Sequence, residues 1–69
     1  MVKYDRLWEL LEKKKIRKHD LMEIAGFSSA TLTKLNKNEI VALMVIVKIC
    51  KALNCRIEDV IEISDEAVV

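Results

Sequence analysis

The sequence predicts an all-α fold in which five short helices pack into one compact domain, and three observations favour this class. The 69 residues include one Gly and no Pro, so the chain lacks the turn signals that an all-β fold requires. Apolar residues make up 52% of the chain and charged residues 33%, a composition that suits amphipathic helices. Apolar positions also recur at helical spacing in successive segments. We therefore expect a single domain over residues 1–69, with a core at about 3–63 and a frayed tail at 64–69.

The first predicted helix spans about residues 4–14. Its apolar positions recur at i, i+3, i+4 and i+7, and they are Tyr4, Leu7, Trp8 and Leu11. We interpret its aromatic side chains as core packing rather than as a platform on which nucleic-acid bases stack. Lysines at 13–15 follow, where positive charge complements the helix dipole.

Two further helices are predicted on either side of the only glycine. The first covers Lys18–Ala25, and its predicted core residues are Leu21, Ile24 and Ala25. Gly26 follows directly, and glycine adopts the left-handed conformation of a helix end without steric cost. Ser28 then suits the N-cap of a helix from Ser29 to about Leu35, whose apolar side is Leu32 and Leu35. The pattern is thus helix, tight turn, helix.

The second half of the chain predicts one longer helix and one short helix. A polar loop at 36–39 precedes a helix over Val41–Leu53, with Asn54 as its C-cap. The predicted core positions of this helix are Leu43, Ile46, Ile49, Cys50 and Leu53. A fifth short helix over Ile57–Val60 follows, and residues 61–63 alternate like a short extended segment.

The net charge is only +1, but the charges are unevenly distributed. Residues 1–37 carry nine Lys and Arg against five Asp and Glu, whereas residues 38–69 carry three against six. Five of the six residues from Lys13 to Lys18 are basic. Such a run is either a solvated face or a surface for an anionic partner such as DNA, and composition alone does not separate the two.

The segment Leu21–Leu32, which reads LMEIAGFSSATL, resembles the helix-turn-helix of the Cro and lambda-repressor type (XRE-like) family of regulators. It shares the family's spacing of leucine, Ala-Gly, an apolar residue, Ser, Thr and a final apolar residue, without insertion. Residues 43–59 are similar to the later helices of a small single-domain subgroup. The resemblance covers roughly residues 3–63 and implies a five-helix, lambda-repressor-like domain. Arg17 departs from the pattern, because the family usually has a Ser or Thr cap there.

This resemblance implies a transcriptional regulator that binds double-stranded DNA sequence-specifically and places the third helix in the major groove. The family's base-reading positions are matched here by Ser29, Ala30, Thr33 and Lys34. The two hydroxyls can bond to several bases, Ala30 or the methyl group of Thr33 can meet a thymine methyl, and Lys34 can donate to guanine. The predicted contacts to backbone phosphates are Arg17, Lys18, Ser28, Thr31, Lys37 and Asn38.

A homodimer is expected on paired half-sites, because members of this family usually bind DNA as dimers. The possible dimer surface consists of Met44, Val47, Ile61 and Ile63, with Val68 and Val69 adding apolar material. These side chains either form such a surface or are buried within the monomer.

The alternative function is a protein-interaction module of the same fold, an antitoxin-like or co-regulator partner with weak or no DNA binding. A recognition helix that had lost its DNA would be expected to carry acidic residues, and Ser29–Leu35 carries none. We predict no enzyme activity, cofactor, small-molecule ligand or metal site, since the only His and the two cysteines, Cys50 and Cys55, match no motif spacing. The longest apolar run, residues 40–47, is too short for a membrane span, and no signal peptide is recognisable. We therefore expect a cytoplasmic protein without membrane contact.

Overall fold

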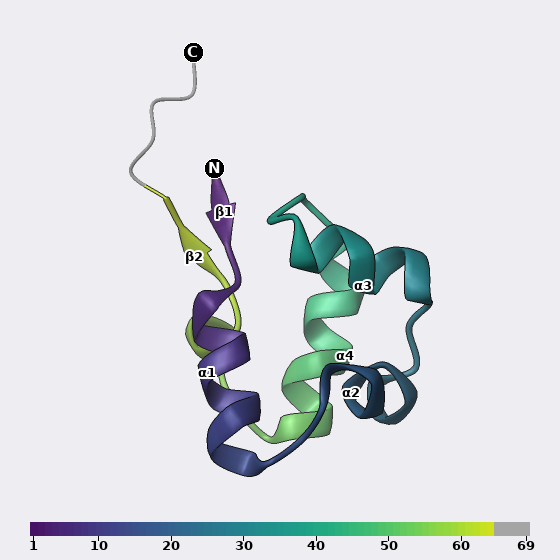
Figure 1. Ribbon diagram of the computed structural model, residues 1–69. Helices are drawn as coiled ribbons and strands as arrows, with labels where there is room; N and C mark the ends of the chain where they lie inside the picture. The colour runs from purple at the N-terminus through teal and green to yellow at the C-terminus, as the bar shows by residue number, and fades with distance from the viewer. Residues whose placement is uncertain (65–69) are drawn as a thin grey trace.

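The computed structural model describes residues 1–64, which form four α-helices, one 3-10 turn and a pair of short strands (Figure 1). In chain order the elements are β1 (Val2–Lys3), α1 (Asp5–Lys14), α2 (Lys18–Ala25), α3 (Ser29–Asn36), α4 (Leu43–Leu53), the 3-10 turn η1 (Ile57–Asp59) and β2 (Glu62–Ile63). The predicted bounds of α1, α2 and α3 agree with these to within one residue at each end. None of the described helices is long and apolar enough to cross a membrane.

The predicted count of five helices is wrong, and the fold is mostly rather than entirely helical. The segment predicted as a fifth helix forms a single 3-10 turn over Ile57–Asp59. After this turn the N–H groups of Val60 and Ile61 both donate to the carbonyl of Ile57 at 3.0 Å, and the chain then becomes extended. Only six residues, 54–59, lie between the end of α4 and the next buried residue, Val60, which leaves no room for a longer helix.

One apolar core joins the helices. Its fully or almost fully buried residues are Tyr4, Leu7, Leu11, Leu21, Leu35, Ile46, Ile49, Leu53 and Val60. The helical members lie three or four residues apart within α1 and α4, so each of these helices turns one stripe inward. Two predicted core residues are wrong: the side chain of Ile24 is 58% exposed and that of Leu43 is 66% exposed. Leu43 lies outside the core because it is the first residue of α4, which begins there instead of at the predicted Val41.

Each of the four helices is closed by a left-handed residue, which is the C-cap itself in α1, α2 and α4 and the residue after the C-cap in α3. The residues with positive φ are Lys15, Gly26, Asn38 and Asn54. In each case the next N–H donates to a carbonyl five residues earlier: Ile16 to Leu11, Phe27 to Met22, Glu39 to Lys34 and Cys55 to Cys50, at 2.9–3.1 Å. This is the Schellman pattern, which satisfies carbonyls that the helix leaves unpaired. The predicted caps at Gly26 and Asn54 are confirmed, whereas those at Lys15 and Asn38 had no sequence signal.

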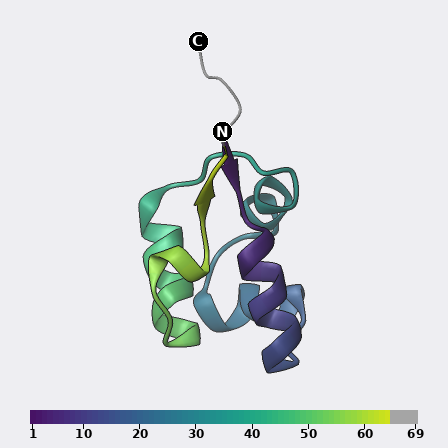
Figure 2. The same ribbon diagram turned by 90° about the vertical axis from the view of Figure 1, so that its left-hand side faces the viewer.

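The two ends of the described chain lie side by side (Figure 2). β1 and β2 pair antiparallel, with Val2 opposite Ile63 and Lys3 opposite Glu62. Ser64 continues this pairing, because its N–H donates to the carbonyl of Met1 at 2.9 Å. The extended segment predicted at 61–63 is confirmed in part as β2, but its partner strand at the N-terminus was not predicted. Ser64, which was expected to belong to a frayed tail over 64–69, is thus bonded to the N-terminal strand, and residues 65–69 lie outside the described residues.

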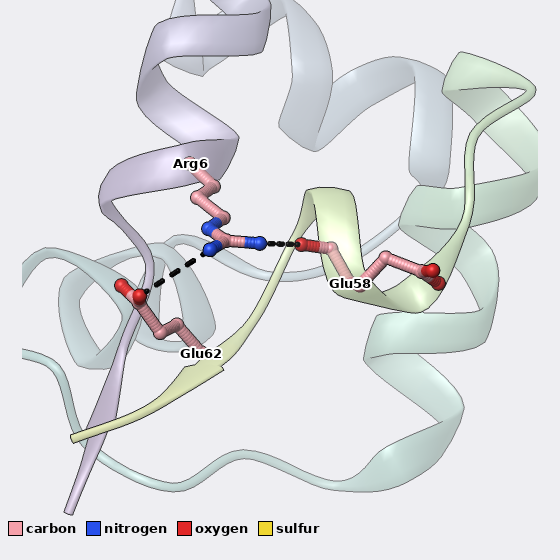
Figure 3. A network of polar contacts seen from close by, with 3 residues as sticks. All are labelled: Arg6, Glu58 and Glu62. Atoms are coloured by element: carbon pink, nitrogen blue, oxygen red, sulfur yellow. Dashed lines mark hydrogen bonds and ion pairs between the residues drawn. The ribbon is translucent and has the colours of Figure 1, made fainter. Parts of the chain in front are cut away.

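Arg6 fastens the strand pair and the 3-10 turn to α1 (Figure 3). Its Nη1 donates to the carbonyl oxygen of Glu58 at 3.3 Å, and its Nη2 lies 3.5 Å from Oε2 of Glu62. Both side chains of the ion pair are about half exposed, so water screens it and its contribution to stability is below about 1 kcal/mol. The contact therefore orients the C-terminal segment more than it stabilises the fold.

Candidate nucleic-acid interface

The interface is centred on α3, whose first turn is held by Ser28. Ser28 adopts an extended conformation, and its Oγ accepts a hydrogen bond from the N–H of Thr31 at 3.2 Å. Its Oγ also lies 3.1 Å from Oγ1 of Thr31, so the two hydroxyls share a hydrogen bond. The predicted N-cap is confirmed. Since the side chain replaces only one missing helical partner, the other N–H groups of this turn stay open to an acceptor such as phosphate.

The four predicted base-reading residues share the outer face of α3. Ser29 and Thr33 are four residues apart, as are Ala30 and Lys34, and all four are exposed. Leu35 on the opposite side is fully buried, which fixes the rotation of α3 about its axis. Lys34 makes no side-chain hydrogen bond or ion pair with residues 1–64. The core therefore presents these four side chains together on one surface.

The hydroxyl of Thr33 is partly committed. Its Oγ1 donates to the carbonyl of Ser29 at 3.1 Å, a bond within the helix that orients the side chain. The oxygen can still accept a hydrogen bond, and the γ-methyl group is held in a defined direction. Thr33 is thus suited to accept from an amino group on cytosine or adenine, or to pack on a thymine methyl.

The predicted phosphate contacts divide into exposed side chains and side chains that already have structural partners. Arg17 and Lys37 are exposed, and neither makes a side-chain hydrogen bond or ion pair within residues 1–64. Arg17 does not cap α2, so the first N–H groups of that helix have no side-chain acceptor. Oδ1 of Asn38, by contrast, accepts from the N–H of Tyr4 at 3.2 Å. Asn38 therefore has only its amide NH₂ group left for a phosphate.

Lys18 is held by two residues that the sequence analysis did not assign to the site. Its Nζ lies 4.1 Å from the centre of the Trp8 ring and donates to Oδ1 of Asn36 at 2.8 Å. Trp8 is half-buried against the core, as predicted, but one ring face also carries this cation. The three residues are distributed over α1, α2 and α3, and no sequence spacing relates them. A contact of this kind could not have been found from periodicity.

A further basic residue, Lys3, comes close to the loop after α3. A cavity of about 240 Å³ is lined by Met1, Val2, Lys3, Lys37, Asn38 and Ser64. The hydrogen bond from Tyr4 to Asn38 fixes the start of α1 against this loop, and the hydroxyl of Tyr4 donates to the carbonyl of Glu39 at 2.7 Å. The structure thus adds Lys3 to the predicted pair Lys37 and Asn38. Lys3 was missed because it lies 34 residues away from Lys37 in the sequence.

Away from α3, the beginning of α4 exposes large apolar side chains. Met44 is 60% exposed and Val47, one turn later, is half-buried. Ile40 and Leu43, which the sequence analysis did not include in this surface, are 63% and 66% exposed. On the last strand, Ile63 is 75% exposed whereas Ile61 packs against the core. The other two residues named for this surface, Val68 and Val69, lie outside the described residues.

The two cysteines meet at the C-terminal cap of α4. Both are half-buried, and both are free thiols. Burial, and after it the neighbouring thiol of Cys50 and the carboxylate of Asp59, raise the pKa of Cys55 from 9.0 to about 11. Since a thiolate is the reactive form, Cys55 is a weak nucleophile at neutral pH. The described residues contain no group of three or more His, Cys, Asp or Glu that could hold a metal ion.

Comparison with known proteins supports the resemblance seen in the sequence. Residues 6–66 match a family described as "Cro/C1-type HTH DNA-binding domain". The structure is similar to the crystal structure of the transcriptional regulator VanUg, with a TM-score of 0.86 and 46% sequence identity, over 88% of this chain and 81% of that chain. No match is found among curated protein sequences.

Proposed function

Because the chain belongs to the Cro/C1-type helix-turn-helix DNA-binding family, we propose that it is a sequence-specific transcriptional regulator that reads an operator with α3. The B-DNA major groove is about 12 Å wide and admits one helix of about that diameter. Ser29, Ala30, Thr33 and Lys34 contact the base edges. Arg17, Lys18, Ser28, Thr31, Lys37 and Asn38 contact the phosphates on either side. The site of action is the cytoplasm, where its DNA lies.

One observation carries the proposal: the core and the Ser28 cap turn a face of small, polar and cationic side chains outward on a short helix. None of Ser29, Ala30 and Thr33 is large enough to keep the helix backbone away from base edges. Neither α3 nor its cap contains a carboxylate that would repel phosphate. This face favours DNA binding over the alternative of a protein-interaction module. A protein-interaction module would work equally well with an uncharged or acidic α3, whereas DNA binding would not.

We propose in addition that two copies bind paired half-sites and meet through the apolar surface at the beginning of α4. This surface consists of Ile40, Leu43, Met44 and Val47. Large apolar side chains that cluster in neighbouring positions on a small protein favour an interface. A second copy is the partner favoured here, because the loop that carries Lys37 and Asn38 leads directly into Ile40. Contact there keeps both copies close to the same DNA.

The test of DNA recognition is selection from a pool of random duplexes at low and high salt, with sequencing of the retained DNA. We expect enrichment of a short motif and an affinity that falls steeply as salt rises. Lys34→Ala should weaken binding to the enriched motif by about 10-fold or more and relax the preference at one base pair. A retained pool without any motif, together with binding that does not respond to salt, would support the protein-interaction alternative.

The test of dimerisation is sedimentation of the free protein and of its complex with the enriched duplex. Met44→Glu should place a charge in the interface, so it should reduce two-to-one complexes while leaving one-to-one binding to a half-site intact. Lys48→Gln on the same helix lowers the net charge by the same amount and controls for the change in charge. Dimers that form equally well with Met44→Glu would disprove this interface.

A further inference from the structure

We propose that Trp8 and Asn36 hold the ammonium group of Lys18 in place as a seat for one phosphate of the DNA backbone. This inference rests on the proposed function and adds two residues, neither of them basic, to its phosphate contacts. Trp8, Lys18 and Asn36 together form this phosphate seat. It joins α1, the start of α2 and the last residue of α3 at a single charged atom.

The geometry leaves the ammonium group able to bind an anion. A lysine ammonium has three N–H donors, and one of them is used by Oδ1 of Asn36 at 2.8 Å. The ring of Trp8, 4.1 Å away, attracts the cation through its π face without supplying a hydrogen-bond acceptor. Neither partner is a carboxylate, so the positive charge of Lys18 is not neutralised. The remaining donor capacity is available to a phosphate oxygen.

Holding Lys18 in this way lowers the cost of the contact. A free lysine side chain loses conformational entropy when it is immobilised. In the phosphate seat the lysine side chain is already ordered in the folded protein, so this entropy is not lost again when DNA binds. Arg17 next to it is exposed and makes no side-chain hydrogen bond or ion pair within residues 1–64. We therefore expect Lys18 to contribute more to DNA affinity than Arg17, which has the same charge but no side-chain partner within residues 1–64.

The seat also connects phosphate binding to the placement of α3. Asn36 is the last residue of α3, and Lys18 is the first residue of α2. A phosphate bound at Lys18 is thus at a defined distance from the end of the helix that reads the bases. Trp8 and Asn36 act as positioning residues in this arrangement, because they act on DNA through Lys18.

The test is binding to a short duplex of random sequence, measured across a range of salt concentrations. Lys18→Ala should lower the slope of log affinity against log salt by about one phosphate contact. Trp8→Leu and Asn36→Ala keep the charge, so they should keep the slope. Each should weaken binding by about two- to five-fold at every salt concentration, because the seated ammonium is less populated. The double variant Lys18→Ala/Trp8→Leu should bind no more weakly than Lys18→Ala alone.

Two controls separate this role from a general effect on folding. Lys48→Ala removes an exposed lysine from α4 and should leave both slope and affinity unchanged. Trp8→Phe keeps a π face and should retain most of the affinity that Trp8→Leu loses. Asn36 is exposed, so Asn36→Ala tests the seat even if Trp8→Leu fails to fold. Trp8 is also the only tryptophan, and DNA should change its fluorescence in the wild type more than in Lys18→Ala.

The proposal is overturned if Lys18→Ala leaves the slope unchanged, if Asn36→Ala binds like the wild type, or if the effects of Lys18→Ala and Trp8→Leu add. Each of these results leaves the proposed function intact as long as the wild type still selects a motif. A wild type that selects no motif and binds no duplex would instead remove the proposed function.

Discussion

α3 begins after Ser28, whose Oγ accepts a hydrogen bond from the N–H of Thr31, whereas α4 begins after Ala42, which has no side-chain acceptor. The first exposed residues of α3 are the small Ser29 and Ala30, and those of α4 are the large apolar Leu43 and Met44. The first helix start thus exposes hydrogen-bonding groups without a carboxylate, and the second exposes large apolar side chains. The comparison separates two properties of a helix start: whether a side chain caps it, which affects stability, and which side chains it exposes, which affects binding.

The largest expected effect contrasts the exposed start of α4 with its buried middle. Ile46→Ala should lower the free energy of unfolding by about 2–5 kcal/mol, because the side chain is 3% exposed and its removal leaves a cavity. Leu43→Ala, three residues earlier, should change it by no more than about 0.5 kcal/mol in the monomer. Urea denaturation measures both values. A large loss for Leu43→Ala would mean that Leu43 belongs to the core after all.

Removal of the cap should weaken α3. Ser28→Ala leaves the N–H of Thr31 without its acceptor and should cost about 1 kcal/mol of unfolding free energy, within a range of about 0.5–2 kcal/mol. Thermal unfolding followed by circular dichroism is the measurement. Ser29→Ala is the matched control, because Ser29 is exposed and does not cap the helix, and its stability should stay close to the wild type.

Addition of a cap should strengthen α4. Ala42 has φ −59° and ψ 140°, a non-helical conformation in which a serine hydroxyl can accept from an N–H of the first turn. Ala42→Ser should therefore raise the free energy of unfolding by about 0.5–1 kcal/mol. Leu43→Ser, one residue further, is inside the helix and should not reproduce the gain. A destabilised Ala42→Ser would show that the start of α4 is not limited by its missing cap.

The smallest expected effect concerns the other end of α4 and appears only at high pH. Burial and the thiol of Cys50 raise the pKa of Cys55 from 9.0 to about 11. Between pH 9 and 11, Cys55 has lost its proton in the unfolded chain but keeps it in the folded chain. Its contribution to the free energy of unfolding is therefore full below pH 9 and decreases as the pH rises towards 11. The difference in Tm between the wild type and Cys55→Ala should therefore be smaller at pH 10.5 than at pH 8. A constant difference would indicate that Cys55 titrates alike in both states.

The sequence by itself determined the parts of the molecule that depend on residues close together in the chain. The apolar spacing of α1, α2 and α3, the turn at Gly26 and the cap at Ser28 all follow from interactions within about five residues, so these predictions are confirmed. The outward face of Ser29, Ala30, Thr33 and Lys34 follows from the same periodicity, because Leu35 is buried and Leu32 is half-buried on the other side of the helix.

Only the tertiary structure decided the contacts between segments that are distant in the chain. The pairing of Val2 and Lys3 with Glu62 and Ile63 closes the two ends of the fold, and two-residue strands carry too little pattern to predict it. Leu43 and Ile24 have the spacing of core residues but lie beyond the area that the neighbouring helices cover. Trp8, Lys18 and Asn36 meet because three helices pack around one core. Periodicity defines which face of a helix is apolar, whereas packing decides how much of that face is covered and what meets at its edge.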